Sequence, residues 1–138
     1  AEVAQNIFDL VVKNMLDPGF NLKTKLSTET VILPSEKACS LALVINELIL
    51  NSLEHGFVGY KEGTIGIEIV NKEDSYLITI YDNGAGLPED FDLQKTKSLG
   101  LQIVRTLVEE DLGGKFKLKS ANGTYASITI PMDKERGK

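Results

Sequence analysis

Three short segments, which follow one another in a fixed order, constrain this sequence more than any other feature. Residues 46–56 read Asn-Glu-Leu-Ile-Leu-Asn-Ser-Leu-Glu-His-Gly, residues 82–88 read Asp-Asn-Gly-Ala-Gly-Leu-Pro, and residues 98–104 read Ser-Leu-Gly-Leu-Gln-Ile-Val. Together they predict one pocket that combines an Asn and a Glu on a buried helix, an Asp beside a glycine turn, and a glycine opening a second helix. A nucleotide with a divalent cation needs those groups.

The first segment lies in a long helix predicted over residues 36–55, with Ser35 as its N-cap and Gly56 as its stop. Apolar residues surround nearly the whole helix, so we expect it to be buried rather than to lie on the surface. Cys39 is expected to be a buried small side chain. The apolar positions are Ala38, Cys39, Leu41, Leu43, Val44, Ile45, Leu48, Ile49, Leu50 and Leu53.

One polar stripe interrupts this apolar helix. Glu47, Asn51, Glu54 and His55 are spaced i, i+4, i+7 and i+8, so they share a face. The Asn51 side-chain oxygen suits Mg²⁺, and Glu47 can accept a proton or hold a water in place. The helix alone leaves open that these side chains only cap loops or face solvent. His55 can interact favourably with the dipole at the C-terminal end of the helix, or it can be a polar residue that anchors the edge of a pocket.

The second segment places Asp82 at the end of a predicted strand, followed by glycines at 84 and 86. A carboxylate there can accept a hydrogen bond from the exocyclic amine of adenine. Gly84 and Gly86 would let the backbone approach the ring without a Cβ clash. The same run is also a common hairpin turn, and that alternative stays open.

The third segment opens a helix predicted over residues 99–112, with Ser98 as its N-cap. Gly100 at this N-terminus would expose amide N–H groups to phosphate. Lys95 and Lys97, in the loop before it, can reach phosphate oxygens or be ordinary solvated charges. Thr124 follows an Asn-Gly turn at 122–123, where a turn or strand role is sufficient.

The remaining periodicities predict an α/β two-layer sandwich, in which helices cover one face of a single mixed sheet. An amphipathic helix is expected over residues 2–16, and a polar, mobile loop over 88–97. The expected strands are residues 21–26, 30–33, 65–69, 76–81, 115–120 and 124–130.

Composition is that of one globular domain over residues 1–138, with 42% hydrophobic and 25% charged residues. The net charge of −5 argues against a nucleic-acid surface. The basic stretch at 115–119 is interpreted as the solvent face of a strand. One cysteine excludes a disulfide framework, and no stretch is long and apolar enough to span a membrane, so a cytoplasmic location is expected. The chain starts without Met, which suggests a piece of a longer protein.

The combination of motifs resembles the Bergerat ATP-binding fold of the GHKL superfamily, shared by DNA gyrase, the mismatch-repair ATPases and histidine kinases. Glu47 with Asn51 resembles the N box, and the runs at 82–86 and 100–104 resemble the two glycine boxes. Gly-Thr at 123–124 resembles the late Gly-Thr element. The likeness covers residues 20–132, and it is similar in detail to the HWE-related sensor histidine kinases.

That resemblance implies ATP and Mg²⁺ as ligands. It implies that Asn51 holds Mg²⁺, that Asp82 reads adenine, and that residues 88–98 close as an ATP lid. It further implies a pocket lined by Gly84, Gly86, Lys95, Lys97, Gly100, Leu101 and Thr124. Glu47 is the candidate catalytic base, or the group that orients the attacking nitrogen.

Two positions depart from the family pattern. Many histidine kinases have Lys where this chain has Glu54, so no phosphate role is assigned to Glu54. Phe91 is the single candidate for the phenylalanine-rich box. His55 is the one histidine of the chain and lies inside the ATP box. The phosphoacceptor is therefore expected on an upstream dimerisation domain, and a response regulator would be served by the parent protein.

Two other functions remain as alternatives. An anti-sigma-factor serine kinase has a compact version of the same fold and a similar Glu-x-x-x-Asn-x-x-x-His-Gly run. A degenerate docking module of this fold would bind partners without chemistry. Gyrase-like ATPases fit less well, because they need a transducer domain.

Overall fold

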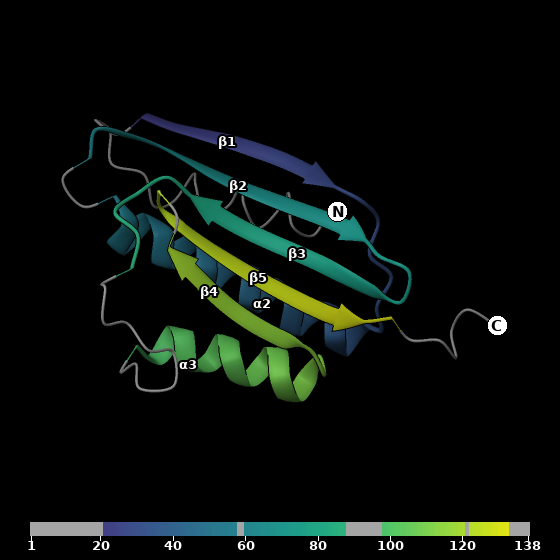
Figure 1. Cartoon of the computed structure of the whole chain (residues 1–138). Helices are drawn as coiled ribbons and strands as arrows, with labels where there is room; N and C mark the ends of the chain where they lie inside the picture. Colours follow the sequence, from purple (N-terminus) through teal and green to yellow (C-terminus); the bar gives the residue numbers. More distant parts are fainter. Residues whose placement is uncertain (1–20, 58–59, 88–97, 121, 133–138) are drawn as a thin grey trace.

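The computed structural model describes residues 21–57, 60–87, 98–120 and 122–132 (Figure 1). The helix expected over residues 2–16 lies outside the described residues. So do most of the expected lid, with Lys95 and Lys97, and nearly all of residues 132–138, which the sequence predicts to be a polar tail.

The sheet has five strands in the order β1-β2-β3-β5-β4 (Figure 1). β1 pairs with β2 in parallel, and the other neighbours are antiparallel, so the predicted mixed sheet is confirmed. The strands are β1 (Asn21–Thr28), β2 (Glu62–Asn71), β3 (Ser75–Asp82), β4 (Lys115–Ser120) and β5 (Thr124–Pro131).

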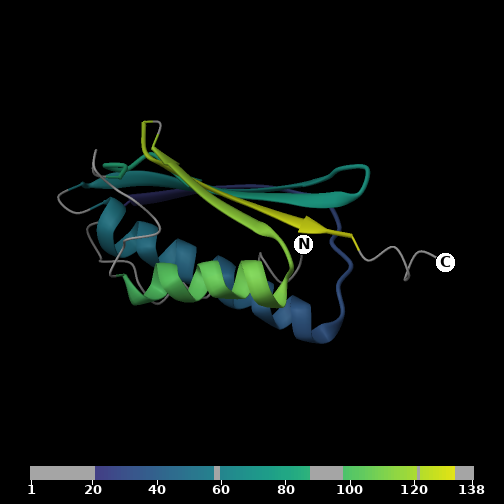
Figure 2. The same ribbon diagram turned by 60° about the horizontal axis from the view of Figure 1, so that its bottom comes forward.

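Both helices lie against the same face of this sheet (Figure 2). α2 (Ser35–Asn51) continues into a π-helical turn, η1 (Ser52–Gly56), and α3 (Leu99–Thr106) continues into η2 (Leu107–Asp111). Along β3 every second residue is buried, ending with Ile78, Ile80 and Asp82. Because side chains alternate between the faces of a strand, these residues point to the helices. The two-layer sandwich is therefore confirmed.

The hydrophobic core fills the space between the helices and this face of the sheet. Fully burying one such aliphatic side chain contributes roughly 1.5–3 kcal/mol. The core holds α2 and α3 in fixed positions against the sheet (Figure 2). The end of α2, the end of β3 and the start of α3, which carry the three motif segments, are thereby fixed relative to one another. The most deeply buried members of the core are Val44, Ile45, Ile49, Ile65, Ile67, Ile78, Val104, Val108, Leu112, Ile128 and Ile130.

α2 is buried on one side only, which corrects the expectation of an apolar helix enclosed all round. Leu43 is 55% exposed, and Cys39 is exposed rather than buried. α2 has the sheet on one side and α3 beside it, and none of the described residues forms a third layer over its outward side. Ser35 is also not the N-cap: the cap is Pro34, and no side chain caps the helix by a hydrogen bond.

Residues 30–33 were expected as a strand, but β1 ends at Thr28 and they form a connection to α2. The chain must leave the sheet there to reach the helical layer, so these residues cannot continue the ladder. The Tyr76 hydroxyl holds this connection, since Oη lies 3.2 Å from the Ile32 amide nitrogen and 3.3 Å from its carbonyl oxygen.

Among the described helices, none has the length and apolarity that crossing a bilayer requires.

Two substitutions on α2 test which side of the helix carries the core. Ile45 is 1% exposed, so Ile45→Ala should lower the free energy of unfolding by about 2–5 kcal/mol through lost burial and a cavity. Leu43→Ala, on the exposed side, should change it by less than about 0.5 kcal/mol. Urea unfolding followed by circular dichroism measures both, and equal losses would contradict the one-sided packing.

Candidate functional site

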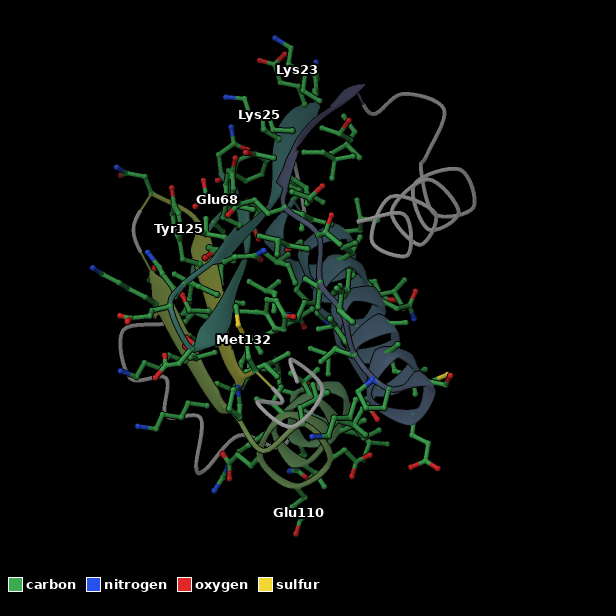
Figure 3. All side chains as sticks on the ribbon, turned by 90° about the vertical axis from the view of Figure 1, so that its right-hand side faces the viewer. Lys23, Lys25, Glu68, Glu110, Tyr125 and Met132 are labelled. Atoms are coloured by element: carbon green, nitrogen blue, oxygen red, sulfur yellow. The ribbon has the colours of Figure 1, made fainter. Side chains whose placement is uncertain are left out.

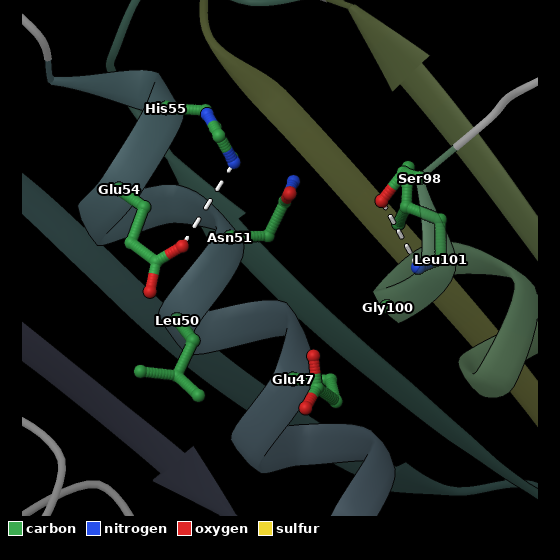
Figure 4. A pocket seen from close by; sticks show the side chains of 8 residues that line it. All are labelled: Glu47, Leu50, Asn51, Glu54, His55, Ser98, Gly100 and Leu101. Carbon is green, nitrogen blue, oxygen red and sulfur yellow. Dashed lines mark hydrogen bonds and ion pairs between the residues drawn. The ribbon is translucent and has the colours of Figure 1, made fainter.

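A cavity of about 250 Å³ lies where the end of α2 meets the start of α3 (Figure 4). The whole predicted polar stripe borders it, and so do Gly100 and Leu101. The sequence therefore identified six of its residues, from two elements that are far apart along the chain. The lining residues are Glu47, Leu50, Asn51, Glu54, His55, Ser98, Gly100 and Leu101.

α2 ends at the rim of the cavity in the π-helical turn η1, a wider turn that is often found at functional sites. His55 Nε2 lies 3.9 Å from Glu54 Oε2 (Figure 4), and the two side chains are 71% and 52% exposed. An exposed contact of this length contributes little to stability. These two residues thus line the mouth of the cavity rather than its floor.

The start of α3 faces Glu47. Ser98 is the N-cap, as predicted, and its Oγ accepts a hydrogen bond of 3.3 Å from the Leu101 amide. A Cβ atom on Gly100 would lie 2.7 Å from Glu47 Oε2. The absence of a side chain at Gly100 therefore allows the Glu47 carboxylate to approach the first turn of α3, where backbone amides also favour anions.

Asp82 is 3% exposed, and three donors from three different elements hold its carboxylate. Oδ2 accepts a hydrogen bond of 2.6 Å from the Ser52 hydroxyl at the end of α2. Oδ1 accepts from the amides of Gly84, at 2.9 Å, and Thr124, at 3.3 Å. A buried charge is tolerated only when it is bonded in this way.

The two oxygens of the Asp82 carboxylate differ in how many hydrogen bonds they accept. Each carboxylate oxygen has two acceptor positions, and both positions of Oδ1 are taken by the Gly84 and Thr124 amides. Oδ2 receives only the Ser52 hydroxyl among the described residues, so it retains one acceptor position.

Asp82 and the 250 Å³ cavity are neighbouring parts of one region. Asp82 is not among the residues that line the cavity. However, it is bonded to Ser52, which directly follows the cavity residue Asn51. The helix end therefore carries the Asn51 side chain toward the cavity and the Ser52 hydroxyl toward Asp82.

The glycine turn after Asp82 packs against the β4–β5 turn. Gly86 has a φ of +80°, a conformation that favours glycine, and the following Leu87 amide donates to Ser120 Oγ at 3.2 Å. Gly84 and Thr124 contribute backbone amides to Asp82, and Gly86 shapes the turn. Their predicted contact with a nucleotide stays a prediction.

Ser52 is the residue that sequence reasoning missed. It lies inside the first polar segment, but its partner Asp82 is 30 residues away. A hydroxyl directly after Asn51 at the end of an apolar helix was the available signal. Lys95 and Lys97 lie outside the described residues, so their predicted place in the pocket stays open.

The donor atoms of the cavity suit Mg²⁺ bound together with phosphate. Within the described ranges no group of three or more His, Cys, Asp and Glu residues could hold a metal ion by itself. Asn51, Glu47 and Glu54 nevertheless bring amide and carboxylate oxygens to one cavity. Mg²⁺ commonly uses one or two protein oxygens and completes its shell with water and phosphate, so these residues fit that role.

Removing the Ser52 hydroxyl tests how the buried carboxylate is held. Ser52→Ala should lower the free energy of unfolding by about 1–3 kcal/mol, because Asp82 Oδ2 loses a donor in a buried position. Ser27→Ala, at an exposed position on β1, is the matched control and should be near neutral. Chemical denaturation measures both, and a neutral Ser52→Ala would show that the hydrogen bond does not stabilise the fold.

The family model of histidine kinase-, DNA gyrase B- and HSP90-like ATPases matches residues 37–134. Sensor histidine kinase PdtaS from Mycobacterium tuberculosis is 38% identical over 110 residues, which cover 78% of this chain and 22% of that protein. Blue-light-activated histidine kinase 2 from Erythrobacter litoralis is 30% identical, over 89% of this chain and 36% of that protein. The chain thus spans between about a fifth and a third of these relatives.

The solved structures agree. The histidine kinase domain of a blue-light-activated histidine kinase from Erythrobacter litoralis has a TM-score of 0.83 at 25% identity, covering 98% of this chain and 63% of that one. The chain therefore belongs to the family of histidine kinase-, DNA gyrase B- and HSP90-like ATPases, with the fold of its histidine kinase members.

Proposed function

We propose that this chain is the ATP-binding catalytic domain of a sensor histidine kinase. It would bind Mg-ATP and transfer the γ-phosphoryl group to a histidine on a separate dimerisation domain. The observation that carries the proposal is the end of α2, which joins the cavity of Glu47, Asn51 and Gly100 to the bonded carboxylate of Asp82. The carboxylate that would accept a hydrogen bond from the base and the cavity that would hold the phosphates then belong to one site.

Different residues would bind the adenine base and the phosphates of ATP. Asp82 Oδ2 accepts a hydrogen bond from the adenine amine at its remaining acceptor position, beside Gly84, Gly86 and Thr124. The phosphates extend toward the N-terminus of α3 at Gly100 and Leu101, where the helix dipole favours anions. Lys95 and Lys97 precede this helix in sequence and would approach the same phosphates.

Asn51 is proposed to hold Mg²⁺, which supplies charge neutralisation on the phosphates. Glu47 lies across from the first turn of α3 and would orient the attacking imidazole and accept its N–H proton. The imidazole nitrogen forms the new P–N bond as the bond from the γ-phosphorus to the bridging oxygen breaks, which leaves ADP. Closure of residues 88–98 would exclude water, so that histidine is the acceptor.

The acceptor histidine is proposed to lie on an upstream dimerisation domain. His55 belongs to the cavity mouth, beside Glu54, where it would contact the nucleotide side of the site. α3 offers a surface for such a partner next to the cavity, since Leu99 is 70% exposed and Ile103, one turn further, is 41% exposed. A response regulator would then take the phosphoryl group from the partner domain.

A serine kinase is the second candidate, because one observation favours it. Serine-protein kinase RsbW from Listeria monocytogenes is 27% identical over 84 residues, which cover 51% of this chain and 54% of that protein. The histidine kinase relatives cover more of this chain at higher identity. The acid stability of the phosphorylated product separates the two, since phosphoserine survives acid and phosphohistidine does not.

The proposal predicts separate effects on binding and chemistry at Glu47. The chain should bind a non-hydrolysable ATP analogue with Mg²⁺ in isothermal titration calorimetry, and Glu47→Gln should keep the dissociation constant within about threefold. With a histidine-bearing dimerisation domain supplied in trans, Glu47→Gln should slow phosphotransfer by about 10²-fold or more, because the base is lost.

Glu36→Gln, at the exposed start of the same helix, is the matched control and should leave both quantities unchanged. Loss of nucleotide binding in Glu47→Gln would instead assign Glu47 to the metal or to the structure. No binding by the unaltered chain would favour the docking-module alternative.

A further inference from the structure

The sheet has a second face, turned away from the helices, which the ATP site does not use. Side chains on each strand alternate between the two faces, so every second residue belongs to this outer face. Figure 3 shows Lys23, Lys25, Glu68 and Tyr125 on the side of the sheet opposite to α2. The strand register extends this face across all five strands.

One row of the outer face runs across the whole sheet. Lys25 on β1 pairs with Gly66 on β2, Gly66 with Tyr81 on β3, Tyr81 with Tyr125 on β5, and Tyr125 with Lys119 on β4. The row therefore has a lysine at each end and an aromatic pair near its centre. We call these five residues the tyrosine row.

The two rings of the tyrosine row form one aromatic surface. Their centroids are 5.4 Å apart and their planes differ by 11°, so they are stacked. The Tyr81 ring lies over Gly66, because any Cβ atom at Gly66 would overlap its outer atoms. Tyr125 remains 38% exposed, so part of this surface faces solvent.

A hollow of about 230 Å³ lies beside the two rings. Lys25 contributes a cation to it, and Thr64, Asn83 and Asn122 contribute polar groups. Asp82 also borders the hollow, although its carboxylate is bonded on the helical side. The cavity of Glu47 and Asn51 shares no lining residue with it, so the two are distinct.

The lysines of the described strands gather on the outer face of the sheet. Five exposed lysines belong to the outer face, and none of them forms an ion pair with another described residue. They are Lys23, Lys25, Lys115, Lys117 and Lys119. The strand acids of this face are Glu62 and Glu68, whereas the helical layer carries Glu36, Glu47, Glu54, Glu109, Glu110 and Asp111. In a chain of net charge −5, this face is locally basic.

We propose that the tyrosine row binds an acidic polypeptide segment with an aromatic residue between its acidic groups. The four strand spacings from β1 to β4 span roughly 19 Å. An extended peptide covers that distance with about six residues. Carboxylates at its two ends would meet Lys25 and Lys119, and the aromatic side chain would pack on the tyrosine rings or enter the hollow.

A polypeptide fits this face better than single-stranded nucleic acid. Stacking platforms with lysines can also bind nucleic acid, but there each nucleotide carries a phosphate. A continuous line of phosphates would lie beside the carboxylate of Glu68, which is in the next row of the outer face, two residues from Gly66 on β2, in a chain of net charge −5. A peptide, by contrast, needs acidic residues only at the positions that meet the lysines, and its other residues can be uncharged.

Fluorescence anisotropy of a fluorescein-labelled peptide, Asp-Asp-Gly-Phe-Gly-Asp-Asp, tests the proposal on the full chain. The peptide should bind, less tightly as salt is raised, and its Phe→Gly version should bind more weakly. Lys25→Glu with Lys119→Glu should weaken binding by about tenfold or more. Tyr125→Ser removes one of the two stacked rings and should weaken peptide binding at a temperature at which circular dichroism shows the variant to be folded.

The matched control is the double reversal Lys37→Glu with Lys72→Glu, which changes the net charge equally but lies on α2 and in the β2–β3 turn. It should leave binding within about twofold once salt is present. An equal loss in this control, or no peptide binding at all, would overturn the proposal. Tighter binding of a labelled ten-nucleotide oligothymidylate through the same residues would overturn it in favour of nucleic acid. ATP binding is measured separately in every variant and should not change.

Discussion

The buried carboxylate of Asp82 is the interaction on which the site depends. A carboxyl group in a residue that is 3% exposed needs bonded partners, and its three donors come from the end of α2, the turn after β3 and the start of β5. It therefore ties the helical layer to the centre of the sheet. Through Ser52 it also fixes the helix end that carries Asn51, so this one carboxylate sets its own distance from the cavity that Asn51 lines.

The alternation of side chains along the strands separates two kinds of surface. On β3, Ile80 and Asp82 point to the helices, and Tyr81 between them points outward. The inner face thus holds the core and the candidate ATP site, and the outer face holds the tyrosine row. A single strand therefore contributes both to the candidate ATP site on one side of the sheet and to the basic, aromatic surface on the other.

Local patterns in the sequence predicted much of this arrangement. The stripe of Glu47 and Asn51, the Ser98 cap and the β4–β5 hairpin follow from helical and strand periods, which depend on near neighbours. The hydrogen bond of Ser52 to Asp82 joins positions 30 residues apart, and the periodicity of a helix or strand gives no information about a pair so far apart in the sequence. The exposure of Leu43 could not be predicted either, because it depends on how many layers cover α2. Residues 30–33 have strand-forming composition, but the path of the chain to α2 overrides it.

The most direct test of the role of Asp82 compares ATP with inosine triphosphate, whose base has a carbonyl in place of the adenine amine. Calorimetry with Mg²⁺ should show that the unaltered chain prefers ATP by at least about tenfold, because a carbonyl facing Asp82 Oδ2 leaves two acceptors opposed. In Asp82→Asn, whose amide can donate, this preference should collapse or reverse. An unchanged ratio of the two dissociation constants in Asp82→Asn would contradict the assignment of Asp82 as the residue that reads the base.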